Sequence, residues 1–144
     1  MRYFIKFNAV SAIFALLPFI MSELLGNSYR INRITGIEIA VLDKVNTAVC
    51  LAGIVLLIVA FVLMLRAKLL PLTKTNLLLS VAWIPYYWLY IQIFVALYPL
   101  NNPADDPNPV SGLIILAGLF LYTLTWIVVN VALFVLKELK EPAH

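Results

Sequence analysis

One acid lies inside the long apolar segments of this chain, and it is the residue best suited to proton or cation chemistry. Glu23 falls near the end of the first apolar segment. Ionisable groups within membrane helices are costly and often mark a site for a proton, an ion or a ligand. Near the end of a helix, a carboxylate can instead reach water or pair with Arg30 or Arg33 of the following loop. We expect this anchoring role for Glu23 and keep an ion or proton site as the alternative.

The third apolar segment carries the densest group of aromatic side chains, around a proline at Pro85. Because proline lacks a backbone N–H, Pro85 predicts a kink in the helix and a freed carbonyl. Four aromatic residues recur at the spacing of one helix face: Trp83, Tyr87, Tyr90 and Phe94. At this spacing Tyr86 and Trp88 should point elsewhere.

Two interpretations of this aromatic face are open. Aromatic residues commonly pack between helices, and this is the simpler interpretation. An aromatic face beside a kink can also stack on a cation, a lipid tail or a quinone-like ring. In that case Tyr122 and Trp126 of the fourth segment, which are four residues apart, complete a groove for a ligand or a partner.

Amide side chains occur in or near all four apolar segments: Asn8, Asn46, Asn76, Gln92 and Asn130. Amides in lipid seek hydrogen-bonding partners on other helices, and each contact contributes about 0.6–2 kcal/mol. Gln92 and Asn130 lie deepest in their segments. We therefore predict that both are buried and make polar contacts between helices.

Motifs for enzymatic chemistry are missing from the sequence. It has no cluster of metal ligands, no nucleophile elbow and no phosphate-binding loop, and its single histidine is the terminal His144. A single cysteine, Cys50, excludes an intramolecular disulfide and metal sites built on cysteine pairs. We expect a protein without catalytic activity, bound metal or cofactor.

Four apolar segments position these residues and take up most of the 144-residue chain, at 7–25, 45–65, 77–100 and 110–136. Apolar residues make up 64% of the sequence, and its mean hydropathy is +1.01. A soluble domain of this size could not bury so much apolar surface, whereas about 20 apolar residues suffice to cross a bilayer. The runs are continuous, unlike the alternating strands of a membrane barrel. We predict an all-α, four-helix transmembrane bundle forming one domain over residues 1–144.

Positive charge is distributed unequally over the connections between these segments. In a four-span arrangement, one side carries seven Lys and Arg residues: Arg2, Lys6, Arg66, Lys68, Lys74, Lys137 and Lys140. The other side carries three: Arg30, Arg33 and Lys44. Lys and Arg in short loops mark the cytoplasmic side. We predict a multi-pass protein of a bacterial-type plasma (inner) membrane with both termini and loop 66–76 in the cytoplasm, and no binding to nucleic acid.

The two external loops differ in their patterns. In loop 26–44, polar or small residues alternate with isoleucine around Thr35-Gly36, which favours a short β-hairpin or an extended strand. An interfacial helix over Gly36–Asp43 that leads straight into the second span is the alternative. Loop 101–109 is rich in proline, and its adjacent acids Asp105 and Asp106 lack the ligand number of a calcium site. We expect a solvated turn there.

These observations favour a protein that acts by binding within or beside the lipid bilayer. We predict an accessory subunit of a larger membrane complex, or an immunity-type protective protein, whose contacts are the aromatic third span and the first external loop. Its partners would be other membrane protein subunits or copies of itself. The alternative is a small oligomeric transporter of a hydrophobic or cationic solute that uses Glu23 and the aromatic face.

Overall fold

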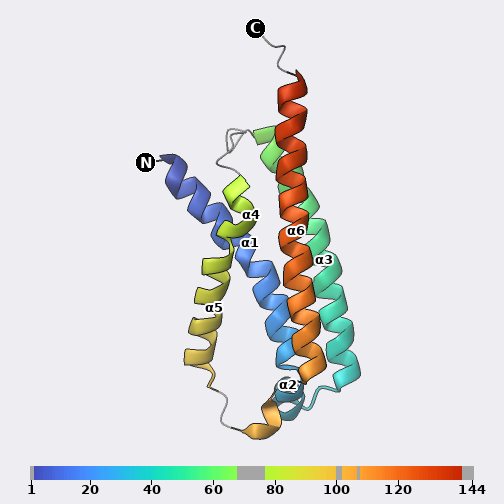
Figure 1. Ribbon diagram of the computed structural model, residues 1–144. Helices are drawn as coiled ribbons and strands as arrows, with labels where there is room; N and C mark the ends of the chain where they lie inside the picture. The colour runs from blue at the N-terminus through green and yellow to red at the C-terminus, as the bar shows by residue number, and fades with distance from the viewer. Residues whose placement is uncertain (1, 68–76, 100–101, 107, 141–144) are drawn as a thin grey trace.

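The computed structural model describes residues 2–67, 77–99, 102–106 and 108–140 (Figure 1). These residues are helical apart from short connections, and none of them forms a β-strand. Four helical segments are long and apolar enough to cross a membrane: Tyr3–Gly26, Ile39–Val59, Leu79–Leu97 and Pro109–Val135. The predicted all-α architecture is confirmed for the described residues, with four helical segments long and apolar enough to cross a membrane.

The first helix, α1 (Arg2–Gly26), is the element around which the others pack. It contacts α3 (Ile39–Ala67), α4 (Leu79–Ala82), α5 (Ile84–Leu97) and α6 (Pro109–Lys140). Figure 1 shows α1 beginning and α6 ending at the same end of the bundle. The short helices α2 (Ser28–Thr35) and η2 (Pro103–Asp105) lie at the opposite end, called the α2 end below.

The third span is divided into α4 and α5, with Trp83 between them. Pro85 lies in the first turn of α5. Its ring cannot donate a hydrogen bond to the carbonyl four residues earlier and would clash with it in a continuous helix. The sequence predicted a kink at Pro85, and the structure shows that the third span is interrupted just before it. This interruption lets α4 pack against α6 while α5 packs against α1.

A second proline, Pro18, lies inside α1, and the helix continues through it. Proline has no N–H to donate to the carbonyl four residues earlier, which here belongs to Phe14. The Tyr122 hydroxyl of α6 donates to this oxygen at 2.7 Å. A carbonyl without a donor is destabilising in lipid, because no water is present to replace the missing hydrogen bond. A side chain of α6 thus supplies the hydrogen bond that Pro18 removes from α1.

The first connection is helical, so the predicted β-hairpin is wrong. Residues Ser28–Thr35 form α2. Its isoleucines and arginines each recur after three residues, at 31 and 34 and at 30 and 33, and this spacing places each pair on one face of a helix. Over so few residues the same pattern also resembled the alternation of a strand. The alternative, a helix over Gly36–Asp43 leading into the second span, is found in part: residues 36–38 are not helical, but α3 begins at Ile39 and includes residues 39–43.

Gly36 ends α2 by adopting a left-handed conformation, with a φ of 72°. Its N–H donates to the Asn32 carbonyl at 2.8 Å, as is usual where glycine terminates a helix. The Asn32 amide in turn donates to the Ile37 carbonyl at 2.7 Å. These bonds redirect the chain from α2 into α3.

At the α2 end, the first and third connections are joined through arginine side chains. Arg33 donates to both carboxylate oxygens of Asp105 in η2, at 2.8 and 2.5 Å. Arg30 donates to the Tyr98 carbonyl at 3.0 Å. We call these contacts the loop clasp. The Asp105 side chain is only 3% exposed, so the expected solvated turn is wrong for this residue.

The loop clasp should make stability depend on pH in the acid range. Hydrogen bonds from Arg33, aided by its charge, hold the pKa of Asp105 below its ordinary value. A lowered carboxyl pKa stabilises the folded state fully above the unfolded pKa of about 3.9, and this stabilisation is lost as pH falls through the folded pKa. In nanodiscs, the midpoint temperature of thermal unfolding should therefore decrease as the pH is lowered below about 4.

Two variants separate this effect from general acid denaturation. Asp105→Asn should lower the unfolding midpoint at neutral pH and reduce its further fall in acid. Asp106→Asn, at an exposed neighbouring acid, should behave like the unmodified protein. If both variants give the same pH profile, the clasp does not contribute.

The hydrogen bond between Tyr122 and Phe14 should show a specific dependence on Pro18. Tyr122→Phe leaves the Phe14 carbonyl without a donor and should destabilise the bundle by about 0.6–2 kcal/mol. In a Pro18→Ala background, the N–H of residue 18 can donate to the same carbonyl, so the loss should be smaller. Unfolding of the four proteins of this double-mutant cycle measures the coupling.

Tyr90→Phe provides the matched control, because its hydroxyl donates to the Ala12 carbonyl at 3.1 Å. Pro18 removes the backbone donor of the Phe14 carbonyl and not that of the Ala12 carbonyl. The cost of Tyr90→Phe should be the same with Pro18 or Ala at position 18. Equal costs for Tyr122→Phe in both backgrounds would refute the proposed role of the Phe14 carbonyl.

Candidate functional site

The aromatic residues predicted to form a groove lie together, and they pack against one another between α1, the divided third span and α6. Trp83 and Trp126 are buried. The ring of Trp83 meets that of Tyr122 edge to face at a centroid distance of 5.0 Å. Trp126 stacks on Phe14 of α1 at 4.2 Å. Side chains of the protein itself therefore occupy this region, which we call the aromatic core.

The rest of the aromatic face extends this packing along α5. Tyr90 lies 5.6 Å from Phe19 between ring centroids, and Phe94 lies 6.1 Å from the same ring. The Tyr87 hydroxyl donates to Ser22 Oγ at 3.2 Å. Pro85, between the two halves of the span, is exposed.

Tyr86 differs from the expectation that it points away from this face. Its hydroxyl donates to Asn8 Oδ1 of α1 at 2.5 Å. The face of α5 that contacts α1 is therefore wider than a single row of residues. Trp88 does point away and is 62% exposed.

The two deep amides have different environments. Asn130 is buried and donates to Ser80 Oγ at 3.1 Å and to the Trp126 carbonyl at 2.8 Å, so it joins α6 to α4. Gln92 is exposed on α5, and the structure differs from the prediction there. Asn76 lies outside the described residues.

Glu23 lies where α1 approaches the α2 end. Its Oε2 accepts a hydrogen bond from Asn27 Nδ2 at 2.7 Å. Within the described ranges it forms no ion pair with Arg30 or Arg33: Arg33 pairs with Asp105, and Arg30 donates to the Tyr98 carbonyl. Glu23 and Arg30 instead line a pocket of about 350 Å³ between α1, α2 and α5.

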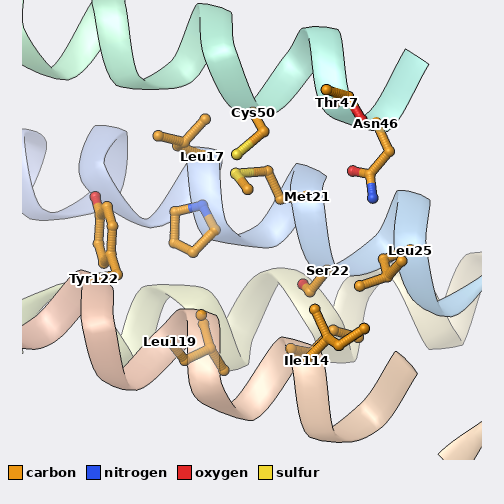
Figure 2. A pocket seen from close by; sticks show the side chains of 13 residues that line it. Leu17, Met21, Ser22, Leu25, Asn46, Thr47, Cys50, Ile114, Leu119 and Tyr122 are labelled. Carbon is orange, nitrogen blue, oxygen red and sulfur yellow. The ribbon is translucent and has the colours of Figure 1, made fainter. Parts of the chain in front are cut away.

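A larger cavity lies on another side of α1, between α3 and α6, and we call it the lateral cavity. Its volume is about 400 Å³, within the range of about 300–1,000 Å³ typical of small-molecule sites. Figure 2 shows side chains of α1, α3 and α6 around it. Most of its lining residues are apolar and none is charged: Leu17, Pro18, Met21, Ser22, Leu25, Asn46, Thr47, Cys50, Ile114, Ile115, Gly118, Leu119 and Tyr122.

Most polar groups of the lateral cavity are already hydrogen-bonded. Ser22 donates to the Phe19 carbonyl at 2.9 Å, and Thr47 donates to the Asp43 carbonyl at 2.8 Å. The amide of Asn46 is the exception, because its Oδ1 is buried and has no hydrogen-bond partner. In Figure 2 this amide points from α3 towards α1.

Two glycines have opposite effects on the packing around α1. At Gly53 of α3, an added Cβ would collide with the Leu17 side chain, so this glycine permits close approach of α3 to α1. At Gly118 of α6, an added Cβ would meet no atom within 4 Å. The missing side chain at Gly118 therefore leaves part of the cavity open.

The lateral cavity was not predicted from the sequence, although Asn46 and both glycines were visible there. Its location depends on the position of α3 relative to α6, which no local sequence pattern gives. Comparison with protein-family models, with curated proteins and with solved structures finds no match for this chain. Its function must therefore be inferred from the sites themselves.

Proposed function

We propose that this chain is a non-catalytic membrane protein that acts by binding, as an accessory subunit of a larger membrane complex or as an immunity-type protein that protects a membrane target. Of the two contact surfaces expected from the sequence, the aromatic face is used for internal packing. The first connection remains available. The observation that supports the proposal is the ordered and exposed helix α2.

Helix α2 and the turn after it present apolar side chains at the α2 end. Ile34 is 64% exposed, Tyr29 is 42% exposed and Ile37 is 40% exposed. The loop clasp fixes the position of this patch through Arg33 and Asp105. A patch that is already ordered loses little conformational entropy on binding, and exposed apolar patches often mark contact sites. The patch therefore suits a partner protein at the membrane surface.

The proposed orientation follows the distribution of charge. The start of α1 and the end of α6 lie opposite α2, on the side that carries seven of the ten Lys and Arg residues under a four-span arrangement. The positive-inside rule places that side in the cytoplasm. The α2 patch then faces the exterior of a bacterial-type plasma membrane, where an external part of another membrane subunit can reach it.

Removal of the α2 patch should weaken association without unfolding the bundle. The double variant Ile34→Ala/Ile37→Ala should lower the amount of stoichiometric partner recovered after native purification in mild detergent, or of homodimer if the partner is a second copy. Burial of an isoleucine contributes about 1.5–3 kcal/mol, so a clear loss is expected. Quantitative mass spectrometry of the purified complex measures it.

Ile13→Ala is the matched control, because Ile13 is 63% exposed and lies within the first span instead of at the α2 end. It should leave association unchanged. A purified protein that is always monomeric and without a partner contradicts the proposal. So does equal loss of partner in the control and in the α2 variant.

A small transporter of a hydrophobic or cationic solute is the second candidate, and the pocket at Glu23 is the observation in its favour. Apart from Glu23, Asn27 and Arg30, the lining residues of that pocket are aliphatic or aromatic, with Phe19, Ile20 and Phe94 among them. One carboxylate oxygen of Glu23 is bonded to Asn27, which leaves the other available to a cation.

Glu23→Gln tests this candidate by removing the charge while keeping the shape. In proteoliposomes, uptake of a lipophilic ammonium coupled to proton flux should be abolished by Glu23→Gln and kept by Asp106→Asn, which changes an acid outside this pocket. Equal uptake by the unmodified protein and Glu23→Gln would exclude Glu23 as the coupling residue.

A further inference from the structure

We propose that the lateral cavity binds an uncharged amphiphile with an aliphatic chain and a hydroxyl group, of the class of long-chain or isoprenoid alcohols. This site is separate from the α2 patch, so the inference does not depend on the proposed partner. Three features of the molecule support this assignment: the position of the cavity, the chemistry of its lining and the Asn46 amide.

The cavity has the shape and surroundings to take an aliphatic chain from the bilayer. Its lining extends from Leu17 to Leu25 along α1 and from Ile114 to Tyr122 along α6. Each of these stretches is about 12 Å long at the rise of an α-helix. All three lining helices belong to predicted membrane spans over these residues, so a ligand can enter from lipid without crossing water.

The lining excludes a charged head group. None of the residues that line the cavity is an Asp, Glu, Lys, Arg or His. A carboxylate or an ammonium placed there would lack a counter-charge and would carry a large desolvation cost. Fatty acids and alkylamines are therefore disfavoured relative to uncharged molecules of the same length.

Asn46 selects among the uncharged molecules. Its buried Oδ1 lacks a donor, and in lipid such a group is costly to leave unpaired. A hydroxyl can donate to Oδ1 and can also accept a hydrogen bond from Nδ2. It thus satisfies the amide in either orientation of the side chain. A ketone, ester or quinone oxygen can only accept and leaves Oδ1 unpaired.

The position of Asn46 also orients the ligand. Asn46 lies near the start of α3, which begins at Ile39, and so towards the α2 end of the cavity. The hydroxyl would lie there, and the chain would extend between Leu17 and Leu119 towards Tyr122. The polar end thus lies nearer the membrane surface, as in a lipid.

Cys50 offers a probe within the unmodified protein, because it lines the cavity and is a free thiol. With the protein in nanodiscs, 1-decanol should slow the modification of Cys50 by the small apolar reagent methyl methanethiosulfonate. The hydrogen bonds with Asn46 should make 1-decanol bind about 3- to 30-fold more tightly than 2-decanone or decane. Decanoate should protect Cys50 least.

Partition of the alcohol into the bilayer must be distinguished from binding to the cavity. Leu51 is adjacent to Cys50 but is 60% exposed and outside the lining. In a Cys50→Ala/Leu51→Cys variant, 1-decanol should give no protection. Equal protection of the two thiols would show partition into the bilayer only and would overturn the proposal.

Two further variants test the geometry. Gly118→Leu should fill the cavity and abolish protection of Cys50 by 1-decanol. Gly112→Leu is the matched control and should keep this protection, because Gly112 is outside the lining. At both glycines an added Cβ meets no atom within 4 Å. Asn46→Leu should keep the cavity but remove the preference for 1-decanol over 2-decanone. If Gly118→Leu fails to fold, the Asn46→Leu variant still tests the proposal. A preference for 1-decanol over 2-decanone that persists in Asn46→Leu would refute the role assigned to Asn46.

Discussion

The arrangement of the bundle depends on satisfying the backbone of α1 in a medium without water. Within lipid every carbonyl needs a donor, and Pro18 removes the one that Phe14 would otherwise receive. The Tyr122 hydroxyl supplies that donor from α6, which requires α6 to approach α1 at this level. Phe14 and Trp126 then stack one turn further along α6, and Asn130 connects the same helix to Ser80 of α4. The aromatic core is therefore built around a backbone requirement as much as around apolar packing.

This requirement also explains what the sequence could and could not predict. The spans follow from composition and length, which are local properties. Proline alone does not decide the course of a helix, because the third span breaks at Pro85 whereas α1 continues through Pro18. The role of the aromatic residues is a different matter. Trp83, Tyr87 and Tyr90 have the same spacing whether they pack internally or line a groove. Only the position of α1 decides between the two, and α1 supplies Ala12 and Ser22 as partners for two tyrosine hydroxyls.

The α2 end and the lateral cavity depend on the relative positions of residues that are far apart in the sequence. Asp105 was expected in a solvated turn because its partner, Arg33, lies 72 residues away in sequence. The opposite charges of Arg33 and Asp105 in the two connections at the α2 end were nevertheless a usable signal. For the cavity, Gly53 and Gly118 have opposite effects although they are the same residue type, because one faces Leu17 and the other faces open space. Residue type alone therefore does not indicate whether a glycine in a membrane helix brings two helices together or leaves a void.

The ion pair between Arg33 and Asp105 has a consequence for biosynthesis. Arg33 follows the first span in the sequence, and Asp105 follows the third. Asp105 can reach Arg33 only after the third span has been inserted. The ion pair therefore cannot form until two further spans have followed the first connection into the membrane. Until then the Arg33 side chain has no carboxylate from η2 to accept its hydrogen bonds. The contact thus distinguishes a chain whose first three spans are inserted from one that has stopped after an early hairpin.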